Sequence, residues 1–444
     1  MEGPGPSWPY LPNTPSDRQE MLRAIGVSSV EDLFADIPDE LLNPALQLPT
    51  PAAELDVRRE VEALARQNAS PGGYSYFLGG GAYRHFIPSL VGRITSRGEL
   101  ATCYTPYQPE VSQGTLQATY EFQSLVCGLT AMDVANAGMY DGATALAEAV
   151  LMACRVTGRD RAIALDTLSP RYKRVIETYV RPQGITVDMV PFTVPEVPDD
   201  AACLVAQYPN FLGNIEDLAF LERKAHEKKA LLVVSVDPIA LGLFKSPGEY
   251  AADVVTGECQ PLGIGLSFGG PYVGLFACRE RYVRQMPGRI VGRTTDSQGR
   301  TGYVLTLQTR EQHIRRERAT SNICTSEALV ATSAAIYLAA LGRQGLRRVA
   351  ELCYHKAHYA ASLIREVPGY KLPFQAPFFK EFIVQVPAPV KEINRRLLDR
   401  KIIGGLDISD LVPNGMLLCV TEMNTKEEIH ALRDALAWAA REAR

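Results

Sequence analysis

An aspartate that closes an apolar run is the first residue in this sequence with a chemical role to consider. The run ALLVVSVDP places Asp237 at the carboxyl end of an expected buried strand. In an open α/β sheet, ligands bind beyond the carboxyl ends of the strands. A buried carboxylate there can pair with a protonated pyridine nitrogen and keep a pyridoxal ring electron-poor. Strand-end aspartates are also common in sheets without a cofactor, so both interpretations stay open.

The lysine that pyridoxal chemistry requires is missing from its expected place. Such enzymes hold their cofactor through a Schiff base with a lysine amine. No lysine occurs between Lys245 and Lys356, the interval in which the strand after Asp237 would deliver one. Lys245 lies in LGLFKSPGEY, beside the turn residues Pro247 and Gly248, and is predicted to be a solvated surface charge. An autonomous pyridoxal enzyme that uses Lys245 remains an alternative.

A second candidate site is the turn ANAGMYDGATA. Gly138 and Gly142 enter an expected helix, whose N-terminal N–H groups suit a phosphate. Asp141 lies in the same turn and would repel a phosphate dianion, whereas as an N-cap it would satisfy those N–H groups. Capping is therefore the favoured interpretation.

Alternating strands and helices must position these residues. Apolar runs of strand length are followed by amphipathic helical patterns from about residue 120 onward. The expected strands lie in RAIALD, GITVDMV, ACLVAQYP and ALLVVSVDP, and expected helices between them include SPRYKRVIETYV and IEDLAFLERKAHEKK. This alternation predicts an α/β fold with a mostly parallel sheet covered on both faces. We predict an N-terminal arm with small helices (1–90), a large α/β domain (91–325) and a smaller C-terminal α+β domain (326–444).

Composition limits the function classes. The 444 residues are 46% hydrophobic and 22% charged, with a formal net charge of -4, which is typical of a soluble globular protein and argues against nucleic acid as a principal partner. The nine cysteines are scattered singly, so we expect reduced core residues and no metal site. The sequence shows neither a secretion signal at its start nor an apolar run of membrane-spanning length. A cytoplasmic location is expected.

Long and unusual phrases resemble the P-protein family of the glycine cleavage system. They are MLRAIGVSSVEDLFADIP, YTPYQPEVSQGTLQATYEFQSLVCGLTAMDVANAGMYDGATA, QYPNFLGNIEDL, ADVVTGECQPLGIGLSFGGPYVGLFA, TLQTREQHIRRERATSNICT and TEMNTKEEI. The resemblance runs almost the full length. It implies the pyridoxal-phosphate transferase-like fold (fold type I) and a glycine-decarboxylating oxidoreductase.

The resemblance also implies a division of labour. The family contains two related halves, and only the C-terminal half carries the lysine. This chain resembles the N-terminal half as a separate subunit, with Gln260 at the lysine's position. The implied partners are the lysine-bearing subunit, two of each chain, which holds pyridoxal phosphate covalently, together with glycine and the lipoylated H-protein. Glycine loses carbon dioxide on the partner's cofactor, and the aminomethyl carbon passes to the lipoyl arm.

Loops ahead of the main sheet are the candidates for completing the partner's active site. FLGGGAYRHFIP and YTPYQPEVSQG combine flexible glycines with polar side chains, as catalytic loops do. The candidate residues are Tyr83, Arg84, His85, Tyr104, Tyr107, Gln108, Gln113 and Gly114. Simple interface packing by the tyrosines is the alternative. Thr320, Ser321 and Asn322 precede a helix, and either cap it or, by family analogy, approach the partner's cofactor phosphate. A non-enzymatic scaffold for the partner also remains possible.

Overall fold

The computed structural model describes residues 13–42, 44–308, 312–323 and 325–442. The chain divides into two compact units, Met1–Asn68 and Ala69–Arg444. In the first unit, α1 (Pro15–Ile25) is followed by the 3-10 helix η1 (Glu31–Phe34) and α2 (Glu54–Ala65). Thr14 and Asp17 form a capping box that starts α1. None of the described residues of this unit is buried.

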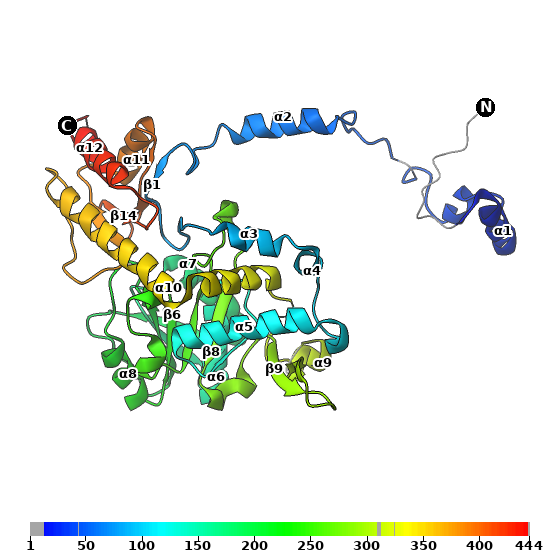
Figure 1. Ribbon diagram of the computed structural model, residues 1–444, viewed down its shortest axis with the longest axis horizontal. Helices are drawn as coiled ribbons and strands as arrows, with labels where there is room; N and C mark the ends of the chain where they lie inside the picture. Colours follow the sequence, from blue (N-terminus) through cyan, green and yellow to red (C-terminus); the bar gives the residue numbers. More distant parts are fainter. Residues whose placement is uncertain (1–12, 43, 309–311, 324, 443–444) are drawn as a thin grey trace. The chain divides into compact units, whose positions relative to one another are not determined.

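The second unit is built on a seven-stranded sheet (Figure 1). Its strands, in order across the sheet, are β2 (Val134–Ala135), β8 (Gly274–Cys278), β7 (Val254–Glu258), β6 (Leu231–Val236), β5 (Ala201–Tyr208), β3 (Arg161–Leu165) and β4 (Thr186–Val190). The strands from β7 to β4 pair in parallel, whereas β8 pairs antiparallel with both β7 and β2. The predicted α/β fold with a mostly parallel sheet is confirmed.

Alternate residues of each strand face two separate cores. Ile163 and Leu165 of β3 pack in one core, which includes side chains of α5 (Gln113–Thr130), α8 (Leu218–Glu227) and α10 (Ala328–Arg365). Ala162 and Ala164 pack in the other, against α6 (Gly142–Thr157) and α7 (Pro170–Val180). Helices therefore cover both faces, which is why the strands read as continuous apolar runs.

The C-terminal segment forms a smaller layer. In a three-stranded antiparallel sheet, β14 (Gly415–Cys419) lies between β11 (Glu381–Gln385) and β13 (Leu406–Asp407). The core of this layer includes side chains of α11 (Val390–Asp399), α12 (Lys426–Glu442) and the end of α10, and Phe77 joins it. β1 (Ser75–Tyr76) pairs in parallel with β12 (Ile402–Ile403), so the chain just before the glycine run is fastened to this layer.

Several local features differ from expectation or refine it. The long helix α10 (Ala328–Arg365) has a kink at Gly342, whose φ of 59° and ψ of -176° are non-helical. A hairpin of β9 (Ile290–Thr295) and β10 (Thr301–Thr306) lies beside α5 (Figure 1). The boundaries expected at 90 and 325 fall inside the second unit and stay a prediction. No helix in the described part of the chain has the length and apolar character to cross a membrane.

Candidate functional site

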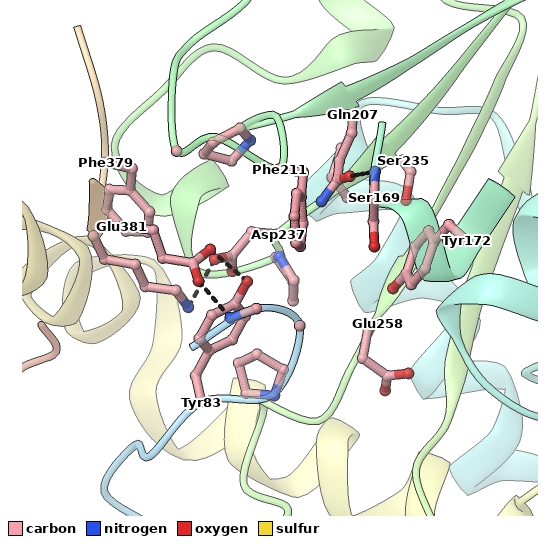
Figure 2. A pocket seen from close by; sticks show the side chains of 18 residues that line it. Tyr83, Ser169, Tyr172, Gln207, Phe211, Ser235, Asp237, Glu258, Phe379 and Glu381 are labelled. Carbon is pink, nitrogen blue, oxygen red and sulfur yellow. Dashed lines mark hydrogen bonds and ion pairs between the residues drawn. The ribbon is translucent and has the colours of Figure 1, made fainter. Parts of the chain in front are cut away.

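A small cavity lies where β6 ends, around Asp237 (Figure 2). The residues that line it come from the glycine run, from strand ends of the large sheet and from the start of β11. They include Gly80, Gly81, Tyr83, Tyr172, Phe211, Asp237, Glu258, Phe379, Lys380 and Glu381. The cavity volume is about 30 Å³. Pockets for drug-sized ligands begin at roughly 300 Å³, so this one holds no more than water.

Asp237 is ion-paired within the chain. The Lys380 Nζ lies 2.7 Å from its Oδ2, and the two side chains are 1% and 10% exposed, respectively. Burial would lower the pKa of Lys380, but the Asp237 carboxylate and nearby thiols raise it above its usual value, so the ammonium stays charged. The Nζ also lies 3.6 Å from the centre of the Tyr83 ring. The carboxylate predicted to meet a pyridinium nitrogen thus meets a lysine of this chain.

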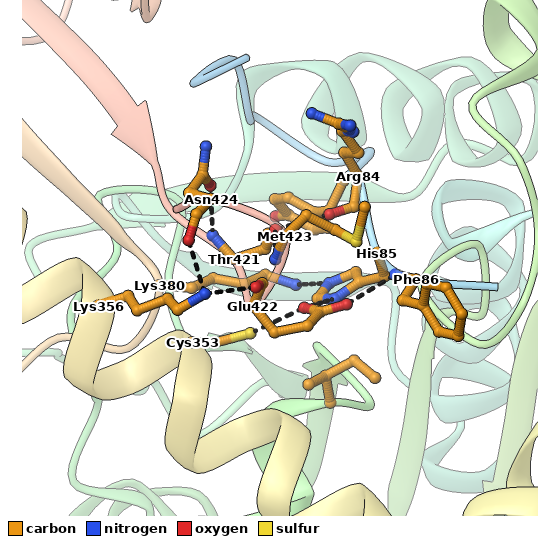
Figure 3. A network of polar contacts seen from close by, with 12 residues as sticks. Arg84, His85, Phe86, Cys353, Lys356, Lys380, Thr421, Glu422, Met423 and Asn424 are labelled. Carbon is orange, nitrogen blue, oxygen red and sulfur yellow. Dashed lines mark hydrogen bonds and ion pairs between the residues drawn. The ribbon is translucent and has the colours of Figure 1, made fainter. Parts of the chain in front are cut away.

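A second set of contacts extends from Lys380 to Glu422 (Figure 3). The Lys380 ammonium donates to His85 Nε2 at 3.0 Å, so the other ring nitrogen, Nδ1, carries the proton and donates to Glu422 Oε2 at 2.7 Å. Burial and the Lys380 charge lower the pKa of His85, which is therefore neutral. Burial disfavours ionised Glu422, but the hydrogen bonds that it accepts outweigh burial and lower its pKa to about 2. The hydrogen bond from His85 makes the largest of these contributions. Cys353 Sγ lies 3.4 Å from the same carboxylate oxygen.

His85, Cys353 and Glu422 also have the donor types of a metal site, with ligand atoms within 4.8 Å of one another. Their geometry favours a hydrogen-bond network instead. The carboxylate already accepts from His85, Cys353 and the Phe86 N–H, and the Lys380 cation adjoins the imidazole. A nearby ammonium opposes the binding of a further cation.

Glu381 and Tyr83 are hydrogen-bonded to each other close to the Asp237–Lys380 ion pair. Glu381 accepts from the Gly80 N–H at 2.6 Å and from the Tyr83 hydroxyl at 2.8 Å. Burial raises the pKa of Glu381. It also raises the pKa of Tyr83 well above its usual value, with the Glu381 and Asp237 charges adding to the effect.

Gln260, the residue predicted from the family resemblance to stand at the lysine's position, is 1% exposed and bound to backbone groups. Its Oε1 accepts from the Tyr83 N–H at 2.7 Å. Its Nε2 donates to the Tyr83 and Ile264 carbonyls, both at 2.9 Å. An amide side chain supplies the donor and the acceptor that this pairing needs, whereas an ammonium could only donate.

At the N-terminus of α6, carboxylates take the place suited to a phosphate. Asp141 caps the helix as predicted, and its Oδ1 accepts from the Thr144 N–H at 2.7 Å. Glu258 accepts from the Gly142 N–H at 2.9 Å. Burial, with a smaller contribution from Asp141, raises the pKa of Glu258 to about 8 despite the N–H groups that it accepts from. This carboxyl group is therefore mostly protonated at neutral pH.

These residues do not fit a pyridoxal cofactor. The candidate pyridinium partner is paired with Lys380, the helix N-terminus meets Glu258, and Gln260 cannot form a Schiff base. The remaining space is about 30 Å³. Lys245 offers no substitute, because it is exposed, lies 4.5 Å from the Tyr250 ring and lines a separate surface groove.

Of the other predicted residues, Tyr104, Tyr107 and Gln108 precede α5, and Gln113 and Gly114 lie at its start. Tyr104, Tyr107 and Gln108 are exposed, with Tyr104 at 75%, and the Tyr107 hydroxyl accepts from Arg289 at 2.7 Å. The expectation of a loop was wrong for Gln113 and Gly114, which form the first turn of α5. The reason is packing, since the Gln113 amide pairs with the backbone N–H and carbonyl of Tyr303.

The segment Thr320–Asn322 precedes α10 without capping it, because Glu327 holds the N-cap position. Thr320 and Ser321 are half-buried and Asn322 is exposed. The Ser321 hydroxyl donates to Glu148 Oε1 at 2.7 Å. The other oxygen of this fully buried carboxyl group, Oε2, has no hydrogen-bond partner among the residues that the structure describes. Burial raises the pKa of Glu148.

Comparison with known proteins defines first the class and then the family. A C-DES variant with glycine covalently linked to its PLP cofactor matches at a TM-score of 0.60 and 16% identity, covering 83% of this chain and 98% of that one. At this identity the match establishes the fold alone. The chain has the fold of pyridoxal-phosphate-dependent enzymes, fold type I, as predicted.

The family follows from nearer relatives. The protein-family model described as "Glycine cleavage system P-protein" matches residues 9–436 of this chain. A protein of Thermomicrobium roseum named "Probable glycine dehydrogenase (decarboxylating) subunit 1" is 52% identical over 443 residues, 96% of this chain and 98% of that protein. A crystal structure of glycine decarboxylase (P-protein) of the glycine cleavage system, in inhibitor-bound form, has a TM-score of 0.91 and 43% identity, covering 97% of this chain and 100% of that one. This chain belongs to the glycine cleavage system P-protein family.

Proposed function

We propose that this chain is the subunit of a split glycine-decarboxylating P-protein that lacks the Schiff-base lysine, and that it is active only with its partner. The pair decarboxylates glycine and transfers the aminomethyl group to the lipoyl arm of H-protein. The name "subunit 1" of a relative that is 52% identical supports a partner subunit. The observation that carries the proposal is the filled site, where Gln260 holds backbone groups and Lys380 holds Asp237.

The partner then supplies what this chain lacks. It holds pyridoxal phosphate through its own lysine, and two copies of each chain form the assembly in the cytoplasm. The alternative of an autonomous enzyme gains no support from the position of Lys245, which is exposed and absent from the lining of the Asp237 cavity.

We assign three groups of residues to the partner's active site. Tyr104, Tyr107, Gln108, Gln113 and Gly114 form an exposed group before and at the start of α5, in which Gln113 is bonded to Tyr303 of the β9–β10 hairpin. Arg84 belongs to the glycine-rich loop, where Tyr83 and His85 are committed to contacts within this chain and support it. Thr320, Ser321 and Asn322 are proposed to lie near the partner's cofactor phosphate.

Reconstitution tests this function. The purified chain is mixed with the lysine-bearing subunit, and glycine-dependent carbon dioxide exchange is measured with lipoylated H-protein. Exchange is expected from the mixture and from neither chain alone. Exchange by this chain alone would overturn the assignment, as would an inactive mixture in which both chains are folded.

The scaffold alternative makes a different prediction for exposed side chains. If the chain only supports the fold of its partner, changes at Tyr104 weaken assembly but leave turnover per assembled complex unchanged. If Tyr104 acts at the partner's site, turnover per complex falls.

A further inference from the structure

The glycine-rich loop that carries Arg84 is held by polar contacts along its length. We call residues 79–86 the clamped loop. Its contacts are Gly80 N–H with Glu381, Tyr83 N–H and carbonyl with Gln260, the Tyr83 hydroxyl with Glu381, the Arg84 carbonyl with Thr421, His85 with Lys380 and Glu422, and Phe86 N–H with Glu422. Such a loop has one conformation, because each broken contact would leave a buried polar group unsatisfied.

Two of the residues that hold this loop lie where a cofactor of this fold is expected to bind. Gln260 stands where the family's lysine would stand, and Lys380 is paired with the aspartate that would face a pyridinium nitrogen. A merely disused site could have been filled by apolar side chains, since a buried ion pair is often no more stable than well-packed hydrophobic residues. Directional contacts aimed at one loop instead indicate that the position of the loop matters.

Arg84 carries the one polar side chain of the clamped loop that is not buried, and the apolar Phe86 is exposed as well. Its neighbours Tyr83 and His85 are 7% and 8% exposed, whereas Arg84 is half-buried. Figure 3 shows its side chain directed away from His85 and Glu422. Among the described residues, no hydrogen bond or ion pair engages its guanidinium, although its backbone carbonyl accepts from the Thr421 hydroxyl at 2.7 Å.

We propose that Gln260, Lys380 and Thr421 are positioning residues that aim Arg84 at an oxyanion in the partner's active site. This inference rests on the proposed function. A guanidinium binds carboxylate and phosphate through two parallel N–H bonds, and this bidentate geometry requires the group to be correctly oriented. The oxyanion is the carboxylate of glycine or the phosphate of the cofactor, the anionic groups that the proposed reaction brings to that site.

The test is a double-mutant cycle in the assembled complex with lipoylated H-protein. Arg84→Ala, Gln260→Ala and the double variant are compared with wild type for subunit affinity, kcat, the glycine KM and the dissociation constant of pyridoxal phosphate. Arg84→Ala is expected to raise one of the last two constants by about tenfold or more. A higher glycine KM identifies the carboxylate, and weaker cofactor binding identifies the phosphate.

The double variant separates positioning from simple structural support. If Gln260 acts only by positioning Arg84, removing Gln260 has no further effect once Arg84 has been replaced. The double variant then matches Arg84→Ala within about twofold. Effects that multiply would overturn the inference. Tyr370→Phe is the control, because it removes a different buried hydrogen bond, to the Leu436 carbonyl, and is expected to leave both constants unchanged. If Gln260→Ala does not fold, Thr421→Val replaces it, since that change removes the side-chain bond to the Arg84 carbonyl with little change of volume.

The outcomes also distinguish the two proposals. If the wild-type complex is active and Arg84→Ala leaves both constants within about twofold of its values, the proposed role of Arg84 alone is overturned. A wild-type complex without glycine-dependent activity overturns both the proposed function and the proposed role of Arg84.

Discussion

Lys380→Met is the substitution that tests the filled site most severely. Methionine has a length similar to that of the lysine stem, so the change removes the ammonium while retaining much of the packing. It leaves the Asp237 carboxylate, which is 10% exposed, without its cation, and removes the donor to His85. Breaking a buried ion pair by deleting one partner costs about 3–5 kcal/mol. We therefore expect the free energy of unfolding to fall by about that amount.

A second substitution checks that the penalty comes from the unpaired charge. Asp237→Asn retains an oxygen to accept from the Ile239 N–H, which Asp237 Oδ1 now accepts at 3.0 Å. In Lys380→Met with Asp237→Asn the carboxylate that Lys380 paired with is itself gone, so at least half of the lost stability should return.

Urea unfolding of the isolated full-length chain at neutral pH, followed by circular dichroism, measures both quantities. The slope with urea should be the same in every variant, so that midpoints report stability. A loss below about 1 kcal/mol in Lys380→Met would show that water reaches this pair and that the site is not sealed. A double variant as unstable as the single one would contradict the ion-pair explanation.

Three further predictions follow from particular side chains. Burial raises the pKa of Glu258 to about 8, so the folded chain holds a proton that the unfolded chain releases above pH of about 4.5. The free energy of unfolding should therefore fall as pH rises from about 4.5 to 8, by up to about 1.4 kcal/mol per pH unit. Glu258→Gln should flatten this part of the pH profile of unfolding, and an unchanged profile would contradict the assignment. Phe268 is fully exposed with a φ of 53°, so Phe268→Gly should raise the melting temperature of the isolated chain, because about 1–2 kcal/mol of left-handed strain exceeds the entropic cost of glycine; a lower melting temperature would refute this. Tyr104→Phe removes one hydroxyl from an exposed side chain and should leave the stability of the isolated chain unchanged. Turnover per assembled complex, measured by carbon dioxide exchange, should fall by about tenfold or more. Weaker assembly with full turnover would favour the scaffold alternative.

Local patterns in the sequence were sufficient for the sheet and for part of the site. Apolar runs that end in polar residues located β3, β5 and β6, and the position of Asp237 at the end of β6 followed from them. Asp141 was predicted as an N-cap because a carboxylate repels phosphate, and it caps α6. The solvated position of Lys245 followed from the turn residues beside it, and Lys245 is exposed.

Contacts between distant segments could not be predicted in the same way. Lys380 and His85 are separated by 295 positions, and Glu381 and Gly80 by 301. The only signal for Lys380 and Glu381 is a charged pair at the start of the apolar run KEFIVQV, and such pairs are usually solvated. Glu258 was overlooked because nothing local indicates that its carboxyl group reaches the start of α6.

We infer that this chain holds no pyridoxal phosphate of its own, and reductive trapping tests this inference directly. The purified chain, without any other subunit, is incubated with pyridoxal phosphate, reduced with borohydride, digested and analysed by mass spectrometry, with the lysine-bearing subunit treated in parallel. We expect a stoichiometric pyridoxyl-lysine peptide from the partner and none from this chain. A stoichiometric adduct on a lysine of this chain, Lys245 or Lys380 in particular, would contradict it.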